Sequence, residues 1–276
     1  MKKAGSNYTP NKMKVKKVTG LSPKVIALSL EFCEKKAAKK FTFEPGQFLM
    51  VSVLGFGESV FTITTAKDDL PGIEIAVRSV GNNTQALHRL KVGDPIWVRG
   101  PYGNYFDLEK MAGREVIIVA GGIGLAPLRS LIRTIEKDPK IIGQLKILVG
   151  AKTPEDLIFK ADLAKWQSFA DVYLACNQDD TDWKGYIGPV TGLINKVKID
   201  KEAIAVLCGP PVMFEPVIKK LEKSGLKDEN IYLMLERRMK CGIGKCQHCT
   251  CGEKYVCLDG PTFTWDQIKD NWETLK

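Results

Sequence analysis

The chain has 276 residues, of which 44% are hydrophobic and 26% are charged, and its formal net charge is +9. This composition is typical of a globular protein long enough for two domains, and it excludes a disordered or fibrous chain. No apolar run of about 18 residues occurs, so no membrane span is expected, and the lysine-rich start lacks the apolar stretch of a secretory signal.

The first twenty residues contain six lysines and no acidic residue. We expect residues 1–12 to form a solvated, partly disordered arm rather than a binding arm. No zinc-finger or helix-turn-helix pattern accompanies the basic residues, so nucleic acid is not an expected partner. A cytoplasmic location is the default expectation, and cysteines there more often serve as metal ligands or redox centres than as disulfides.

Between about Met13 and Phe106 the sequence alternates short β-type runs with turns that contain Gly and Pro. The runs read VIALSLEFC, FTFEPGQFLMVSVL, GIEIAVRSV and DPIWVRG. Short strands between closely spaced turns are typical of an antiparallel barrel or sandwich. We therefore predict an all-β domain over residues 1–110, the basic arm included.

From Arg114 onward, short apolar runs alternate with helical segments. The predicted strands read EVIIVA, LKILVG, DVYLA, AIAVLCG and NIYLMLE, and the predicted helices read APLRSLIRTIEK, PEDLIFKADLAKW, GLINKV and PPVMFEPVIKKLEKSG. Apolar strands separated by helices indicate a parallel, doubly wound sheet. We predict this α/β domain over residues 111–235.

A glycine-rich turn, VAGGIGLAPLRS, joins the first strand of this domain to its first helix. Gly121, Gly122 and Gly124 would let the backbone approach a pyrophosphate at the helix N-terminus. Many glycine turns are only tight turns, but here the strand–turn–helix context favours a dinucleotide site. Two features depart from the usual fingerprint: Pro127 replaces the third glycine, and the next strand ends at Lys152 without an acidic residue.

The stretch CGPPVM, Cys208 to Met213, follows another predicted strand. In a doubly wound sheet this position lies beside the glycine turn, in the crevice where ligands bind. The alternative is a plain strand-to-helix turn with Pro at the start of the helix. The Cys-Gly-Pro pattern is specific enough to favour a site that includes Cys208, Gly209, Pro210 and Met213.

Two segments of the β-domain are further candidates, GESVFTITT at residues 57–65 and VRSVGNNTQAL at residues 77–87. The backbone N–H groups of VGNNT and the hydroxyl of Thr84 can bind phosphate. On the residues alone this signal is weak, because threonine is common in amphipathic strands.

The C-terminal segment, residues 236–276, is rich in cysteine, poor in periodicity and too short to fold on apolar burial alone, so we predict a metal staple. It contains five of the eight cysteines. Cys241, Cys246 and Cys249 follow the spacing C-x4-C-x2-C, and Cys257 comes after seven more residues. This spacing is similar to that of plant-type 2Fe–2S sites. Zinc sites prefer paired C-x2-C units, and only one such unit exists here, so iron–sulfur is favoured over zinc.

Two other side chains in this segment compete as ligands. Cys251 lies two residues beyond Cys249, on the same side of an extended chain. Since Cys246 and Cys249 are spaced to hold neighbouring positions, Cys251 is expected to be a bystander. His248 lies between two ligands, and the only other histidine, His88, is in the β-domain, so a Rieske-type pair of histidines is not expected.

Taken together, these motifs resemble ferredoxin–NADP reductase-like electron-transfer subunits that carry FAD and a C-terminal 2Fe–2S cluster. The family includes the electron-transfer subunit of dihydroorotate dehydrogenase, the corresponding subunit of anaerobic sulfite reductase, and the gamma subunit of soluble nickel–iron hydrogenases and sulfhydrogenases. The resemblance extends from about Met13 to Trp265 and is carried by GGIGLAPLRSLI, GPYGNYF, CGPPVM and LERRMKCGIGKCQHC, with KYVCLDGPTFTW most similar to the hydrogenase and sulfite-reductase branch. It implies an antiparallel flavin-binding β-barrel, a doubly wound parallel-sheet nucleotide-binding domain and a small C-terminal iron–sulfur lobe over residues 236–276.

The resemblance also implies roles for the matching barrel residues. Those that would lie along the flavin or hold its ribityl and pyrophosphate are Phe61, Thr62, Thr64, Val80, Gly81, Asn83 and Thr84. The segment that reads Arg-x-Tyr-Ser in many relatives reads Ser-Val-Phe-Thr at residues 59–62. The arginine that would neutralise the pyrophosphate is therefore missing, and backbone donors or Arg78 must compensate.

In the second domain the resemblance assigns the nicotinamide dinucleotide loop to Gly121, Gly122, Gly124 and Pro127. It places Cys208 beside the nicotinamide ring, where the protein positions cofactors that supply the chemistry. Glu236 resembles an acidic residue that assists proton movement near the flavin; alternatively, it pairs with Arg237 or Arg238 at the strand end. Lys152 can meet the 2′-phosphate of NADP, but Glu155 and Asp156 would repel it, so we expect a slight preference for NAD.

The implied function is electron transfer from NAD(P)H through FAD and the 2Fe–2S cluster to another subunit. No sirohaem motif, nickel motif or second cysteine cluster is present, so a catalytic redox partner such as a hydrogenase or sulfite reductase must hold the substrate centre. One alternative is a stand-alone or bifurcating ferredoxin–NAD(P) oxidoreductase subunit, since the basic charge suits an acidic ferredoxin. A different class is a zinc-stapled regulatory protein that only senses dinucleotide.

Overall fold

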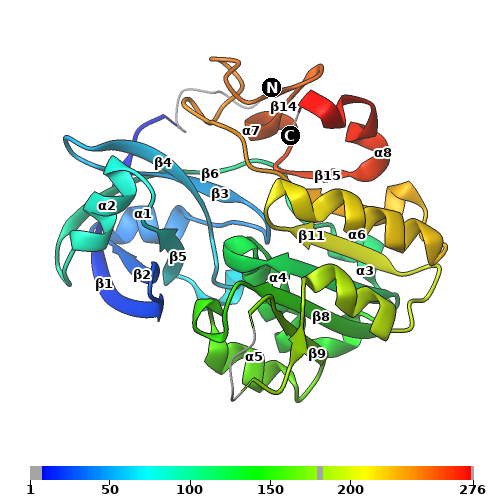
Figure 1. Cartoon of the computed structure of the whole chain (residues 1–276). Helices are drawn as coiled ribbons and strands as arrows, with labels where there is room; N and C mark the ends of the chain where they lie inside the picture. The colour runs from blue at the N-terminus through cyan, green and yellow to red at the C-terminus, as the bar shows by residue number, and fades with distance from the viewer. Residues whose placement is uncertain (1–7, 179–182, 275–276) are drawn as a thin grey trace.

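The computed structural model describes residues 8–178 and 183–274. A β-barrel lies on one side, an α/β domain lies on the other, and the C-terminal lobe lies across both (Figure 1). Among the described residues, no helix is both long and apolar enough to cross a membrane.

The barrel consists of six antiparallel strands in the order β4-β3-β6-β1-β2-β5. Their bounds are β1 (Asn11–Ser22), β2 (Val25–Phe32), β3 (Phe48–Val53), β4 (Gly57–Thr62), β5 (Ile73–Arg78) and β6 (Pro95–Tyr102), with the helices α1 (Lys35–Lys40) and α2 (Asn82–Arg89) between them. The two end strands meet where the N–H of Thr64, just beyond β4, donates to the carbonyl of Glu74 on β5 at 2.9 Å. Alternate residues such as Leu28 and Leu30 fill the interior. The predicted antiparallel β-domain is confirmed.

The predicted basic arm, residues 1–12, overlaps the first strand. β1 begins at Asn11 and pairs with β6. Met13 and Val15 are buried, whereas the lysines that alternate with them are exposed, which is the period of a half-buried strand. Residues 1–7 of the arm lie outside the described residues.

The α/β domain contains a seven-stranded sheet in the order β10-β9-β8-β7-β11-β12-β15. Its strands are β7 (Glu115–Gly121), β8 (Gln144–Ala151), β9 (Asp171–Cys176), β10 (Tyr186–Ile187), β11 (Ile204–Cys208), β12 (Ile231–Met234) and β15 (Thr262–Thr264). All neighbours are parallel except β12 and β15. The predicted doubly wound sheet is therefore confirmed.

Helices cover both faces of this sheet. They are α3 (Leu108–Met111), α4 (Leu125–Lys137), α5 (Lys160–Trp166) and α6 (Pro211–Lys223), with a 3-10 helix at Val190–Lys196. Leu128 of α4 and Trp166 of α5 belong to one core cluster, and Val217 of α6 belongs to the other. The parallel strands thus have apolar packing on both faces, which explains their continuous apolar runs.

One predicted helix is shorter than expected. The stretch predicted as a helix over 154–166 begins as a 3-10 turn at Pro154–Asp156, and α5 starts only at Lys160. Leu157 and Ile158 between them are buried in the core. Their packing outweighs the helix preference of the stretch.

The C-terminal lobe is joined to both other parts rather than packed as a separate unit. It contains β13 (Thr250–Cys251), β14 (Lys254–Tyr255), α7 (Val256–Asp259) and α8 (Trp265–Ile268), followed by a 3-10 helix at Lys269–Thr274. Its strand β15 extends the nucleotide-domain sheet beside β12. A single core cluster includes Met50 of the barrel, Leu233 of the sheet and Val256 of the lobe.

Candidate functional site

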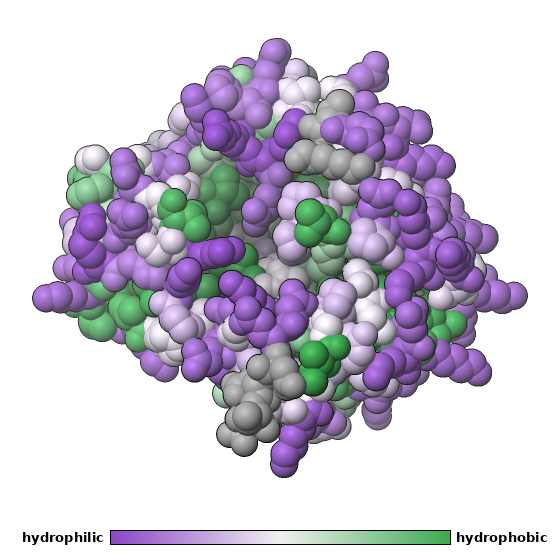
Figure 2. All heavy atoms as spheres, in the orientation of Figure 1, coloured by the Kyte–Doolittle hydropathy of each residue, from purple (hydrophilic) through white to green (hydrophobic). Residues whose placement is uncertain are grey.

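A crevice opens between the barrel and the α/β domain, at the carboxyl ends of β7, β8 and β11. Figure 2 shows a hollow near the centre of this face, with hydrophobic residues in its walls. One part, the nucleotide pocket, has a volume of about 770 Å³, and the other, the barrel pocket, has about 570 Å³. Residues that line both pockets are Arg78, Ile123, Cys208, Leu235 and Glu236. The two pockets therefore meet at the predicted Cys208 and Glu236.

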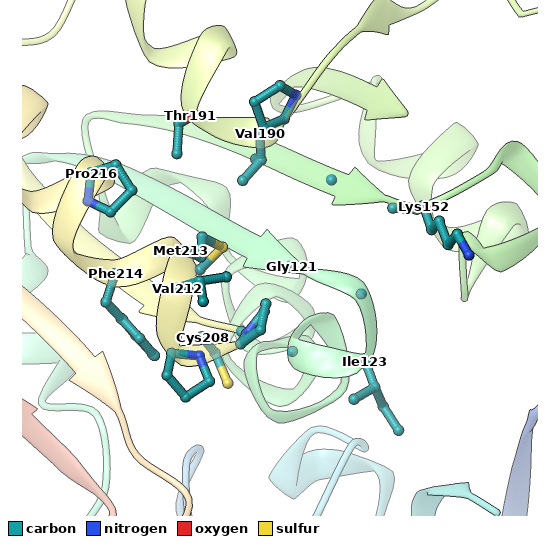
Figure 3. A pocket seen from close by; sticks show the side chains of 18 of the residues that line it. Gly121, Ile123, Lys152, Val190, Thr191, Cys208, Val212, Met213, Phe214 and Pro216 are labelled. Carbon is teal, nitrogen blue, oxygen red and sulfur yellow. The ribbon is translucent and has the colours of Figure 1, made fainter. Parts of the chain in front are cut away.

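The glycine turn after β7 forms one wall of the nucleotide pocket (Figure 3). Gly122 has a φ of +57° and open space where a Cβ would stand, so the backbone itself faces the pocket. A Cβ on Gly124 would lie 2.3 Å from the Cys208 carbonyl oxygen, so only glycine fits there. Helix α4 begins directly after this turn, and its free N–H groups make the turn a suitable cradle for a diphosphate.

Pro127 lies in the first turn of α4, where a missing N–H costs no helical hydrogen bond. It lines the barrel pocket rather than the nucleotide pocket. Lys152 lines the nucleotide pocket at some distance from Cys208, with Gly121 between them in Figure 3. The predicted loop residues are thus divided between the two pockets.

Cys208 ends β11 and is almost completely buried. Burial raises the pKa of its thiol, and the nearby carboxylate of Glu236 raises that pKa further. The thiol is therefore neutral at physiological pH, which suits a positioning role and not that of a nucleophile. Gly209, Pro210 and Met213 line the nucleotide pocket around it, as predicted from the CGPPVM stretch.

Trp272 also lines the nucleotide pocket, although no sequence pattern indicated it. Its ring packs edge-on against Phe214 of α6, with ring centroids 5.6 Å apart. The contact exists because β15 brings the C-terminal lobe to the edge of the nucleotide-domain sheet. Only that long-range pairing, which no local pattern reveals, would have identified the tryptophan.

Four of the predicted flavin residues line the barrel pocket, namely Phe61, Thr62, Val80 and Thr84. The Thr84 hydroxyl oxygen accepts hydrogen bonds from the N–H groups of Val80 and Gly81, both at 2.9 Å. These contacts fix the turn at the start of α2. Thr84 thus acts on the local backbone as well as facing the pocket.

The remaining predicted flavin residues do not line the pocket. The Asn83 amide donates to the Ser59 hydroxyl at 3.0 Å and to the Val51 carbonyl at 3.2 Å, which ties α2 to the barrel. Thr64 is fully buried, and its hydroxyl donates to the Glu74 carbonyl at 3.1 Å. Gly81 serves through its backbone, as described above. These three residues thus stabilise the segments that carry the pocket-lining residues.

Four cationic residues line the barrel pocket. Arg237 donates to the Thr250 carbonyl, which leaves Arg78, Arg238 and Lys240. Within residues 8–178 and 183–274, none of the three side chains makes an ion pair or a hydrogen bond. A pocket lined by unpaired cations suits a ligand with anionic groups, as a flavin diphosphate has. These cations come from β5 and from the segment before Cys241. That Arg78 compensates for the missing arginine of the Arg-x-Tyr-Ser segment stays a prediction.

Glu236 is exposed and lines both pockets. The alternative ion pair with Arg237 or Arg238 is not seen in the described part of the chain. Arg237 instead donates to the Thr250 carbonyl, at 3.2 Å from its Nη2 atom. Glu236 therefore lies at the junction of the two pockets, without an ion pair to either arginine.

The cysteine loop surrounds its thiols with backbone donors. The N–H groups of residues 243, 245 and 246 donate to the Sγ atom of Cys241 at 3.3–3.5 Å. The N–H of Gly244 donates to Cys257 Sγ at 3.1 Å, and that of Cys257 donates to Cys249 Sγ at 3.5 Å. Donors aimed at sulfur stabilise thiolates and tune iron–sulfur centres. The loop thus fits an anionic cluster held by the four predicted cysteines.

The four thiols of the loop lie close enough to affect one another. Burial, followed by a hydrogen bond with the Cys249 thiol, raises the pKa of Cys257 to about 12. The backbone of His248 is the main cause of the lowering of the Cys246 pKa to about 7, with a smaller contribution from the Cys241 thiol. In the part of the chain that the structure describes, no three ligating side chains converge on one metal position.

The two competing ligands are placed differently from these four. Cys251 is buried in the shared core, burial raises its pKa, and no backbone N–H of the described residues donates to it. The exposed ring of His248 has its Nδ1 atom 3.0 Å from the Cys246 carbonyl oxygen. Both arrangements agree with the predicted bystander roles, which stay predictions.

Comparison with known proteins matches each part of the chain to a family model. An oxidoreductase FAD-binding domain matches residues 12–106, an oxidoreductase NAD-binding domain matches residues 118–219, and the iron–sulfur cluster binding domain of dihydroorotate dehydrogenase B matches residues 236–269. These matches support FAD, NAD and an iron–sulfur cluster as the cofactors, and they disfavour the zinc-stapled alternative.

Full-length relatives agree with these domain matches. The gamma subunit of sulfhydrogenase 2 from Pyrococcus furiosus is 35% identical, with coverage of 95% of this chain and 97% of the relative. A probable dihydroorotate dehydrogenase B (NAD(+)) electron transfer subunit from Methanocaldococcus jannaschii is 33% identical, with coverage of 84% and 83%. A chain of the NADH-dependent reduced ferredoxin-NADP oxidoreductase structure shares the fold, with a TM-score of 0.75, 23% identity, and coverage of 99% of this chain and 95% of that one. The chain belongs to the family of FAD-, NAD- and iron–sulfur-binding electron-transfer subunits that includes the sulfhydrogenase gamma subunits and the dihydroorotate dehydrogenase B electron transfer subunits.

Proposed function

We propose that this chain moves electrons between a nicotinamide dinucleotide in the nucleotide pocket and a partner redox subunit, through FAD in the barrel pocket and a 2Fe–2S cluster in the cysteine loop. One observation carries the proposal. Cys208 and Glu236 line both pockets, and the segment from Glu236 to Lys240 continues along the barrel pocket and leads directly to Cys241. The proposed dinucleotide and flavin sites thus share lining residues, and the proposed cluster loop continues directly from the flavin site along the chain.

The bound cofactors supply the redox chemistry, since a flavin accepts a hydride as two electrons and releases electrons singly to an iron–sulfur cluster. The residues of this chain bind and orient them. We propose that Phe61, Thr62, Val80 and Thr84 form the flavin wall, while Thr64, Gly81 and Asn83 hold that wall from behind. The neutral thiol of Cys208 positions the nicotinamide, and Glu236 exchanges a proton with solvent at the junction. The dinucleotide cradle consists of Gly121, Gly122, Gly124, Lys152, Gly209, Pro210 and Met213, and Pro127 faces the flavin side.

The exit for electrons is proposed at Cys246, which is the only one of the four described ligands that is not buried. The segment from Arg237 to Cys249 contains no acidic residue, and Lys245, beside Cys246, is exposed outside both pockets. A partner with an acidic face fits this surface and would be steered to it. Since the relatives are subunits of sulfhydrogenases and of dihydroorotate dehydrogenase B, we propose a catalytic redox subunit as the partner, in the cytoplasm, with a ferredoxin as the alternative.

We assign each cofactor to one of the three predicted parts of the chain. We propose residues 1–110 as the FAD-binding unit, 111–235 as the NAD(P)-binding unit and 236–276 as the cluster unit. The shared core and the pairing of β15 with β12 support a cluster unit that is rigidly attached to the other two.

Replacement of Cys208 tests the junction of the pockets. Cys208→Ala should lower NADH-dependent reduction of an artificial dye by roughly 10- to 100-fold, because small losses of alignment at the reacting centre have effects of that size. FAD content and reduction by dithionite should stay unchanged. Cys176→Ala is the matched control, since Cys176 is also a buried strand cysteine but lines neither pocket. Unchanged turnover in Cys208→Ala would contradict the assignment.

A further inference from the structure

Helix α4 carries a row of cations on the face that meets the barrel. Arg129, Arg133 and Lys137 are spaced four residues apart, so they lie on one side of the helix. Arg133 pairs with Asp69 at 3.1 Å, and Lys137 pairs with the same carboxylate at 3.0 Å. Both contacts join the nucleotide domain to the barrel segment between β4 and β5.

Arg129 makes the most extensive contact of the row. Its Nη1 atom donates to the Glu74 carboxylate at 2.9 Å and to the Thr64 carbonyl at 3.1 Å, both on the barrel. Its Nε atom donates to Asp162 of α5 at 2.5 Å. The guanidinium carbon lies 4.4 Å from the centre of the Phe159 ring.

The contact is buried, and both the Nε and the Nη1 atoms of Arg129 are hydrogen-bonded. Arg129 is 7% exposed, and its planar fork holds three oxygens from different segments at once. A lysine in its place has the charge but not the fork. Arg133 and Lys137 are more exposed, with side-chain exposures of 27% and 35%, so their pairs contribute less to the fixed geometry.

The position of Arg129 links the two pockets. Helix α4 begins directly after the glycine turn of the nucleotide pocket. Thr64 lies two residues beyond Thr62, which ends β4 and lines the barrel pocket. The Arg129 side chain therefore joins the helix that starts at the dinucleotide cradle to the residues that directly follow the strand of the flavin wall.

We propose that Arg129 is a positioning residue for hydride transfer: it fixes the nucleotide pocket in register with the barrel pocket without touching either cofactor. This inference rests on the proposed function. If the guanidinium of Arg129 is removed, the rate of hydride transfer should fall much more than the affinity for FAD or for the dinucleotide.

The test compares Arg129→Lys with the wild type, with Glu136→Gln as the matched control. Glu136 is on the same helix and pairs with Lys165 at 2.7 Å, within the nucleotide domain. In anaerobic stopped-flow, Arg129→Lys should reduce the rate constant of flavin reduction by NADH by roughly 10- to 100-fold. Its primary isotope effect with C4-deuterated NADH should change, whereas FAD content, the Kd of NADH and reduction by dithionite should stay within about twofold. Glu136→Gln should behave as the wild type.

A second readout needs no cofactor. In the FAD-free protein, amide hydrogen exchange of residues 64–74 should be faster in Arg129→Lys and in Glu74→Gln than in the wild type. The first change removes hydrogen bonds of the guanidinium, and the second removes the charge of the carboxylate that accepts one of them. An unchanged rate constant with an unchanged isotope effect would overturn the proposal, and so would an equal loss of FAD binding, NADH binding and rate. If the wild type itself takes no hydride from NADH, the proposed function fails instead, while faster exchange of residues 64–74 would still show the link between the domains.

Discussion

The cysteine loop and the crevice between the domains are built in opposite ways. All four proposed cluster ligands lie between Cys241 and Cys257, and the N–H groups that donate to their sulfurs belong to the same stretch. The crevice is lined by residues as far apart in sequence as Arg78, Cys208 and Trp272. A change in the loop should therefore affect one cofactor, whereas a change in the crevice spreads through contacts between distant segments.

The largest effect is expected from the loop itself. Cys246→Ser removes one of the four thiolates, so the 2Fe–2S cluster should be lost or strongly disturbed, with loss of its visible absorption and iron. Direct reduction of FAD by NADH should persist, since neither pocket includes Cys246. Cys251→Ser is the control and should keep the cluster. Loss of iron from Cys251→Ser but not from Cys249→Ser would refute the ligand assignment.

Arg99 joins the crevice to the cysteine loop, so its replacement should destabilise the contact between these two regions. Its guanidinium pairs with Glu58 in the wall of the barrel pocket and donates to the Cys241 carbonyl at 3.2 Å. The Glu58 carboxylate keeps the pKa of Arg99 above its usual range. Arg99→Met would leave Glu58 without its partner and should lower the free energy of unfolding by about 3 kcal/mol.

Chemical denaturation of the Arg99→Met protein measures this effect. The control is Lys14→Met, because the pair of Lys14 with Glu31 is exposed on both sides and should contribute less than about 1 kcal/mol. Equal destabilisation by the two variants would mean that the buried link between barrel and loop is no stronger than a surface ion pair.

A smaller, kinetic effect is expected in the nucleotide pocket. Lys152 is exposed there, and the Asp156 carboxylate, which accepts a hydrogen bond from Thr153 at 3.1 Å, lies close in sequence. Because an exposed charge contributes about 1 kcal/mol at most, Lys152→Ala should change kcat/KM for NADH and NADPH by less than about fivefold each, with NADH still preferred. A selective loss of NADPH use would show that the preference for NAD was the wrong expectation.

The smallest effect is a pH dependence of the contact between α4 and the barrel. Burial alone would raise the pKa of Asp69, but the hydrogen bond with Lys137, a backbone hydrogen bond and Arg133 outweigh it, so the pKa lies below its usual 3.8. A lowered pKa in the folded state gives stability that is present above the unfolded value and is lost as the pH falls through the folded one. Unfolding free energies measured between about pH 5 and pH 2 should decline less steeply for Asp69→Asn than for the wild type; parallel curves would contradict this.

The same contrast explains what the sequence could predict. The ligand spacing, the glycine turn and the CGPPVM stretch are local patterns, and the structure places their residues at a cysteine loop and at the carboxyl ends of parallel strands. The contacts of Arg129, Arg99 and Trp272 join segments that are distant in sequence, and no periodicity reveals them. The late start of α5 has the same origin, since the burial of Leu157 and Ile158 depends on the completed core.

The order of electron flow tests the central claim most directly. NADH is mixed anaerobically with the complete protein and with protein depleted of FAD, and the flavin absorbance and the EPR signal of the reduced cluster are followed in time. In the complete protein the flavin absorbance should fall before or with the rise of the cluster signal. Without FAD the cluster should stay oxidised, and added FAD should restore its reduction. Reduction of the cluster by NADH at the same rate without FAD would contradict the proposed path.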